Sequence, residues 1–176
     1  KTAIDLYGDT LSSIWISAGG NDFAGESDLL PLLEDDCSAA TTPEECFVFG
    51  PGGVEVFFQT IESYYRAMLG YAYTRTPANC HTVMHTYDYA IPNGKGLGRG
   101  KGWLLDALVK ANVPEPLRHP CVKWLIDQHT RVLNTIAASD PTSLHVVDSR
   151  DVLSATDWAN ELHPTGEGFK KIAAQS

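Results

Sequence analysis

The chain has 176 residues, of which 13 are basic and 22 acidic, so its formal net charge at pH 7 is −9. With 43% hydrophobic and 20% charged residues, the composition is that of an ordinary globular protein, with a single domain over residues 1–176. The acidic balance argues against a nucleic-acid-binding protein, because neutralising phosphates requires a basic face. No apolar run approaches the ~20 residues that cross a bilayer, so we expect no membrane span.

The four cysteines stand at positions 37, 46, 80 and 121, and no two of them form a C-x-x-C pair. This spacing gives no support to a zinc ribbon or a thioredoxin motif. Cys37 and Cys46 bracket a polar stretch, which predicts a loop closed by a disulfide, with two unrelated thiols as the alternative. The even cysteine count favours a secreted or periplasmic protein over a cytoplasmic one.

The first half of the chain predicts one strand and one long helix. Residues 13–17 are short, apolar and β-prone, and they run directly into a glycine loop, which predicts a strand that ends in a tight turn. Residues 25–53 contain three prolines and predict irregular structure. From Val54 to Met68 the apolar positions recur at offsets of 3, 4, 7, 10, 11 and 14, which predicts a helix of about four turns.

The second half predicts two more strands, at 82–87 and 144–148, and a closing helix at 166–174. A glycine-rich loop over 93–102 precedes a short apolar helix over 103–108. The helix with the clearest pattern has these positions on its apolar face: Val122, Leu125, Ile126, His129, Val132, Leu133 and Ile136. Strands that alternate with helices in this order predict an α/β protein with a parallel sheet.

The first predicted strand points to a sheet with further members. Three strands are few for this architecture, because a parallel strand is buried on both faces and its edges need pairing or covering. Residues 13–17 are almost wholly apolar, so another strand should lie beside them. We therefore expect N-terminal strands, from an N-terminal segment or a second chain, to complete the sheet.

The glycine-rich loop and the histidines give little support to a phosphate or metal site. Lys101 is followed by Gly102 rather than by Ser or Thr, and no G-x-G-x-x-G register fits, so we interpret the loop as a surface loop over an active site. His81 and His85 are four residues apart, but position 82 is Thr where a zincin has Glu. We interpret both as structural histidines, and His129 as a core residue.

Two short blocks at opposite ends of the chain carry the chemistry. The block Gly-Gly-Asn-Asp at 19–22 follows the first predicted strand, where a sharp glycine turn can aim the Asn21 amide at a developing oxyanion. His163 lies in a loop before the last helix and is followed by Pro164, which suits an exposed general base. Together these blocks indicate acyl-transfer chemistry.

With these blocks the sequence resembles the SGNH/GDSL hydrolase family of esterases and lipases over residues 10–174. The block at 19–22 matches the family's G-x-N-D block, and His163 falls where the family has the histidine of its D-x-x-H block. The resemblance implies a three-layer α/β/α flavodoxin-like parallel sheet and neither a metal nor an organic cofactor. It also implies that a serine nucleophile hydrolyses a carboxylic ester or an acyl or acetyl group of a small molecule.

The family's nucleophile lies in a G-D-S block, which this sequence lacks. Thr10 follows Gly8 and Asp9, but it stands only nine residues before Gly19, too few for the strands and crossover that should separate the two blocks. We expect the nucleophilic serine upstream of Lys1, with this chain as the C-terminal three-quarters of the domain. The alternatives are an inactive SGNH-like domain that binds a carbohydrate or ester, and a nucleotide-binding module, which the missing phosphate loop disfavours.

Asn160 stands where the family has the aspartate of its D-x-x-H block. An amide oxygen accepts a hydrogen bond from imidazole but carries no charge, and in serine proteases the same Asp→Asn change lowers kcat by about 10⁴. We expect a main-chain carbonyl, or else Asp157 or Glu161, to orient His163. Asp157 has the alternative role of capping a turn.

The substrate cleft is expected at the carboxyl ends of the strands, where open α/β sheets bind ligands. Gly19 and Gly20 would contribute their backbone there. At the end of the second strand, Tyr87, Asp88 and Tyr89 would line the cleft, with ordinary cover over the sheet as the alternative.

Overall fold

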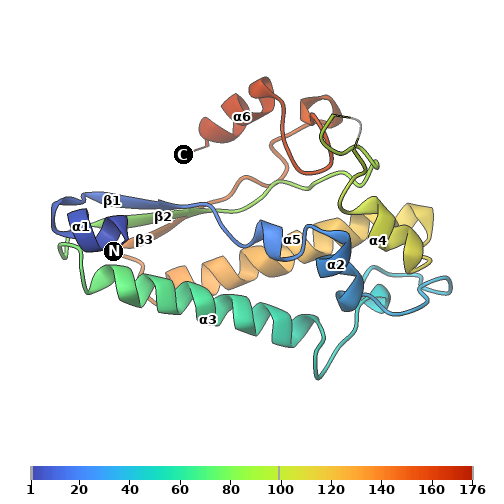
Figure 1. The fold of residues 1–176 in the computed structure, drawn as a ribbon, viewed down its shortest axis with the longest axis horizontal. Helices are drawn as coiled ribbons and strands as arrows, with labels where there is room; N and C mark the ends of the chain where they lie inside the picture. Colours follow the sequence, from blue (N-terminus) through green and yellow to red (C-terminus); the bar gives the residue numbers. More distant parts are fainter. Residues whose placement is uncertain (1, 99, 176) are drawn as a thin grey trace.

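The computed structural model describes residues 2–98 and 100–175 and shows an α/β protein with a three-stranded parallel sheet flanked by helices (Figure 1). The strands are β1 (Ser13–Ile16), β2 (His81–His85) and β3 (Leu144–Val147), in the order β1-β2-β3. Both pairs are parallel. The three predicted strands are confirmed, each to within two residues at either end.

Two long helices, α3 (Val54–Tyr73) and α5 (Glu115–Ala138), lie along one face of the sheet (Figure 1). The predicted apolar face of α5 is confirmed, because all of its residues are buried. On α3 the face is narrower than predicted: Val54, Phe58, Ile61 and Tyr65 are buried and Phe57 is partly buried, whereas Tyr64 and Met68 are exposed. Helix α5 begins seven residues before the first predicted apolar position, since Pro116 is tolerated in its first turn and the helix continues through Pro120.

The remaining helical segments are short and connect these elements. The predicted helix at 103–108 is α4 (Leu105–Lys110), and the closing helix is α6 (Gly166–Ala173). The region 25–53 is irregular as predicted, apart from single turns of helix. The other short segments are α1 (Ala3–Tyr7), α2 (Glu26–Leu29), η1 (Gly8–Thr10), η2 (Gly20–Asp22), η3 (Leu30–Leu32), η4 (Glu44–Cys46) and η5 (Ala155–Asp157).

The two faces of the sheet are covered differently. On one face, Met84 and Leu144 are buried in the same core as Leu133 of α5. On the other face, where α6 lies in Figure 1, Trp15 is 66% exposed. Among the described residues β1 pairs only with β2, so its second edge is open to another strand.

The predicted disulfide between Cys37 and Cys46 is not formed in the structure, where both are buried free thiols. The Cys37 thiol donates instead to the main-chain carbonyl of Cys46, at 3.6 Å. Burial, together with the neighbouring Cys46 thiol, raises the pKa of Cys37 to about 12. This environment keeps the thiol protonated and therefore poorly reactive.

Candidate functional site

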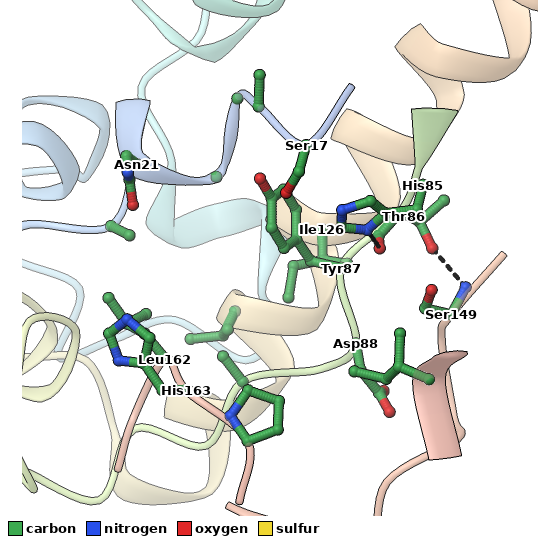
Figure 2. A pocket seen from close by; sticks show the side chains of 18 of the residues that line it. Ser17, Asn21, His85, Thr86, Tyr87, Asp88, Ile126, Ser149, Leu162 and His163 are labelled. Atoms are coloured by element: carbon green, nitrogen blue, oxygen red, sulfur yellow. Dashed lines mark hydrogen bonds between the residues drawn. The ribbon is translucent and has the colours of Figure 1, made fainter. Parts of the chain in front are cut away.

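A cavity of about 440 Å³ lies at the carboxyl ends of the strands and is closed on one side by α6. The residues after β1, β2 and β3 and the loop before α6 all contribute to it, because the carboxyl ends of parallel strands meet at one edge of a sheet (Figure 2). Six of the predicted site residues line it: Gly19, Gly20, Asn21, Tyr87, Asp88 and His163.

The turn after β1 requires its two glycines. Gly19 has φ of +91°, and a Cβ there would lie against the Nε2 atom of His129 and 3.0 Å from the Tyr65 hydroxyl. A Cβ on Gly20 would lie 2.7 Å from the Tyr87 ring. The close approach lets η2 begin at Gly20, soon after β1 ends at Ile16, and places Asn21, an exposed residue, at the cavity (Figure 2).

His163 is oriented by the side chain of Asn160. The Nδ1 atom of His163 lies 2.9 Å from the Asn160 Oδ1 atom. The same oxygen accepts the main-chain N–H groups of Leu162 at 3.0 Å and His163 at 2.9 Å, which identifies it as the amide oxygen rather than the nitrogen. Because this oxygen only accepts, Nδ1 carries the proton and Nε2 is left as the basic nitrogen.

The groups predicted to orient His163 were a main-chain carbonyl, Asp157 or Glu161, and among the described residues none of them bonds to its ring. Asp157 accepts from Ser154 and pairs with Lys171 at 2.7 Å, and its hydrogen bonds, that from Lys171 first, lower its pKa to about 2. It therefore caps a turn, which was the alternative interpretation. Glu161 is fully buried and accepts main-chain N–H groups of two other segments, at Gly94 and at Leu104 and Leu105. Among the described residues, no main-chain carbonyl accepts from the His163 ring.

The three residues after β2 separate in the structure. Tyr87 lines the cavity, with its ring edge-on to His85 at 5.4 Å. Asp88 also lines it, but its carboxylate is occupied by main-chain N–H groups, including that of Leu153 at 2.6 Å. The prediction that Tyr89 lines the cavity is wrong, because its hydroxyl donates to Asp127 on α5 at 2.8 Å.

A buried pair beneath the glycine turn was not predicted. The Tyr65 hydroxyl donates to the carbonyl of Ala18 at 2.6 Å and lies 3.3 Å from the Nε2 atom of His129. Burial, with a smaller effect from His85, lowers the pKa of His129 to about 4, so the ring is neutral at pH 7. His129 is the core residue that the sequence predicts, and it also supports the turn that carries Asn21. A histidine in an otherwise apolar series was the only signal.

Two further histidines form a pair far from the cavity. The Nδ1 atom of His81 lies 3.2 Å from the Nε2 atom of His145, because β2 and β3 bring them side by side. No group of three potential ligands among the described His, Cys, Asp and Glu residues could hold a metal ion. Within residues 2–98 and 100–175, no serine or threonine hydroxyl forms a hydrogen bond with His163.

Comparison with known proteins assigns no family. No protein-family model, no curated protein and no solved structure matches this chain. Within the described part of the chain, no helix is both long enough and apolar enough to traverse a bilayer. The residues of the cavity are therefore the basis for inferring a function.

Proposed function

We propose that this chain is part of a serine hydrolase of SGNH type, with the flavodoxin-like α/β/α architecture of that family. The proposed hydrolase acts on small carboxylic esters or on acyl or acetyl groups. The observation that carries the proposal is the arrangement of His163 and Asn21 at one cavity. His163 has its Nδ1 proton fixed by Asn160, and Asn21 reaches the same cavity from the turn after β1 (Figure 2).

The proposed roles follow from these positions. The Nε2 atom of His163 takes the proton of a serine nucleophile and later activates the water that releases the acyl group. The Asn21 amide donates to the oxyanion that develops during each step. Apolar side chains, including Phe23, Leu104 and Ile126, line much of the cavity, which suits an acyl group better than a charged one.

Asn160 makes this a weaker catalytic unit than one with aspartate. Its oxygen fixes the tautomer of His163, but a neutral amide gives an imidazolium little electrostatic stabilisation. The proposed hydrolase therefore has a low kcat, because its His163 is well oriented but poorly stabilised when it is protonated.

The nucleophile is proposed to come from outside the described residues. The open edge of β1 supports this, because a strand paired there would end beside Asn21 and the cavity.

Hydrolysis of p-nitrophenyl acetate by the protein purified from its native source tests the proposal. We expect turnover that the His163→Ala variant abolishes, while His145→Ala, an exposed histidine at the other end of the sheet, retains it. Equal turnover by both variants would contradict the role of His163.

An inactive domain that binds a carbohydrate or an ester is the second candidate. Asn160 and the absence of a hydroxyl group bonded to His163 among the described residues favour it. In that case the native protein would hydrolyse no ester, but acetylated sugars would raise its melting temperature, and Tyr87→Ala would remove this effect.

A further inference from the structure

Glu161 is a fully buried carboxylate without a cationic partner among the described residues. A charge in such a place is costly unless hydrogen bonds satisfy it. Its oxygens accept the main-chain N–H groups of Gly94 at 2.7 Å, Leu104 at 2.7 Å and Leu105 at 3.1 Å, and also that of Trp103. Hydrogen bonds to an ionised acceptor are stronger than neutral ones, so this contact is a strong one.

These bonds join the loop of His163 to two other segments, the glycine-rich loop and the first turn of α4. A further main-chain bond runs from the Glu161 N–H to the carbonyl of Lys95, at 3.1 Å. Gly102 leaves the space for the carboxylate, because a Cβ there would lie against both of its oxygens. The Trp103 ring then stands edge-on to His163, with ring centroids 5.6 Å apart.

Other contacts of the His163 loop, residues 157–165, are hydrogen bonds within it and apolar packing, since Trp158 and Leu162 pack against the hydrophobic core. The bonds to Asn160 lie inside the loop and would move with it. On the other side, the Asp157 carboxylate pairs with Lys171 of α6. Among the described residues, the hydrogen bonds that attach this loop to the α4 side of the cavity are those of the Glu161 carboxylate and its main-chain N–H.

We infer that Glu161 is a positioning residue, whose buried carboxylate holds the loop so that His163 stands against Trp103 and faces the cavity. Its importance for catalysis rests on the proposed function, whereas its effect on the position of His163 does not. A glutamine in its place would turn an N–H₂ donor toward main-chain donors, so it cannot reproduce the contact.

NMR spectroscopy of the 176-residue chain tests the position directly, with Glu161→Gln as the variant and Glu167→Gln as its control. Glu167 is an exposed residue of α6 that pairs with Lys170. In Glu161→Gln we expect the nuclear Overhauser contacts between Trp103 and His163 to disappear and the His163 ring signals to shift. The amides of Leu104 and Leu105 should exchange about tenfold faster or more, while those of the α5 core keep their rates.

A second variant keeps the inference testable if Glu161→Gln fails to fold. Gly102→Ala displaces the carboxylate without removing its charge, and Gly70→Ala is its control, since a Cβ on Gly70 meets nothing within 4 Å. Gly102→Ala should also lose the Trp103–His163 contacts, and Gly70→Ala should keep them.

Retention of these contacts in the folded Glu161→Gln variant, or in Gly102→Ala, would overturn the inference even if the amides exchange faster. In an active form of the enzyme, Glu161→Gln should lower kcat about 10- to 100-fold and leave KM nearly unchanged, because it misplaces a catalytic base. If the ring contacts depend on Glu161 but the protein from its native source hydrolyses no ester, the proposed function is contradicted and the positioning role stays intact.

Discussion

At the scale of single residues, the hydrogen bonds of each polar side chain at the cavity decide whether it can act on a ligand. The Asn160 oxygen takes three hydrogen bonds within one loop and leaves only Nε2 of His163 as a base. The Asp88 carboxylate is occupied by main-chain N–H groups, so it holds the loop after β3 rather than a substrate. Among the described hydrogen bonds, none involves the Asn21 side chain, so its amide is available for a ligand.

Substitution of Asn21 tests its role as an oxyanion donor. Asn21→Ala should lower kcat about 10²- to 10³-fold and leave KM nearly unchanged, because the donor acts on charge that develops in the transition state. Steady-state kinetics on p-nitrophenyl acetate measure this, with Asn134→Ala, an exposed asparagine on α5, as the control. A raised KM at unchanged kcat would mean that Asn21 only binds the substrate, and the oxyanion role would have to be withdrawn.

In the proposed hydrolase, the identity of residue 160 should affect kcat. Asn160→Asp keeps an oxygen beside Nδ1 of His163 and adds the charge that stabilises an imidazolium, so we expect kcat to rise at least about tenfold. The same ester assay checks this. An unchanged or lower kcat would show that lack of charge at this position does not limit the reaction.

At the scale of elements, α5 supports the turn after β1 through His129, and this contact makes stability depend on pH. The pKa of His129 in the folded protein is about 4, below the 6.5 of a free histidine, so the unfolded chain binds a proton first as the pH falls. The free energy of unfolding should therefore decrease by about 3 kcal/mol from pH 7 to pH 4 through this residue. The stabilisation from Asp157, whose pKa is about 2, is lost mainly below pH 4.

Urea titrations across this range measure the effect. His129→Gln, whose side chain does not ionise, should show a smaller loss of stability between pH 7 and pH 4 than the wild type. His145→Gln changes an exposed histidine and should behave as the wild type does. The same loss in all three proteins would contradict the assignment.

The thiols of the protein are buried, and we expect them to remain reduced. All four cysteines are buried and free. A thiol reagent should therefore react with none of them in the folded protein and with all four in urea. An intact mass 2 Da below that of the reduced chain would instead reveal a disulfide and restore the prediction of a bridged loop.

The sequence predicted the elements better than the contacts between them. The strands and both long helices follow from the apolar periodicity, which burial in the core enforces. Tyr89 was misplaced because β2 ends at His85, so the chain beyond it no longer follows the alternation of a strand. The role of Glu161 could not be predicted, since its partners are main-chain amides far away in the sequence.

At the scale of the whole molecule, the cavity lies at the carboxyl ends of the strands, next to the end of β1, whose second edge is unpaired among the described residues. His163 and Asn21 face the cavity, yet among the described residues no hydroxyl group is bonded to His163. A strand added to β1 would supply one at the right end of the sheet and would cover an exposed edge. The central claim is therefore that the protein is a serine hydrolase whose nucleophile lies outside these residues.

Labelling of the protein from its native source with a fluorophosphonate, followed by peptide mapping, tests this claim most directly. The reagent forms a covalent bond with an activated serine, and His163→Ala should prevent labelling because it removes the base. The account predicts one labelled serine, outside residues 1–176. A label on a serine within this chain, such as Ser17 at the cavity, or labelling that persists in His163→Ala, would contradict it.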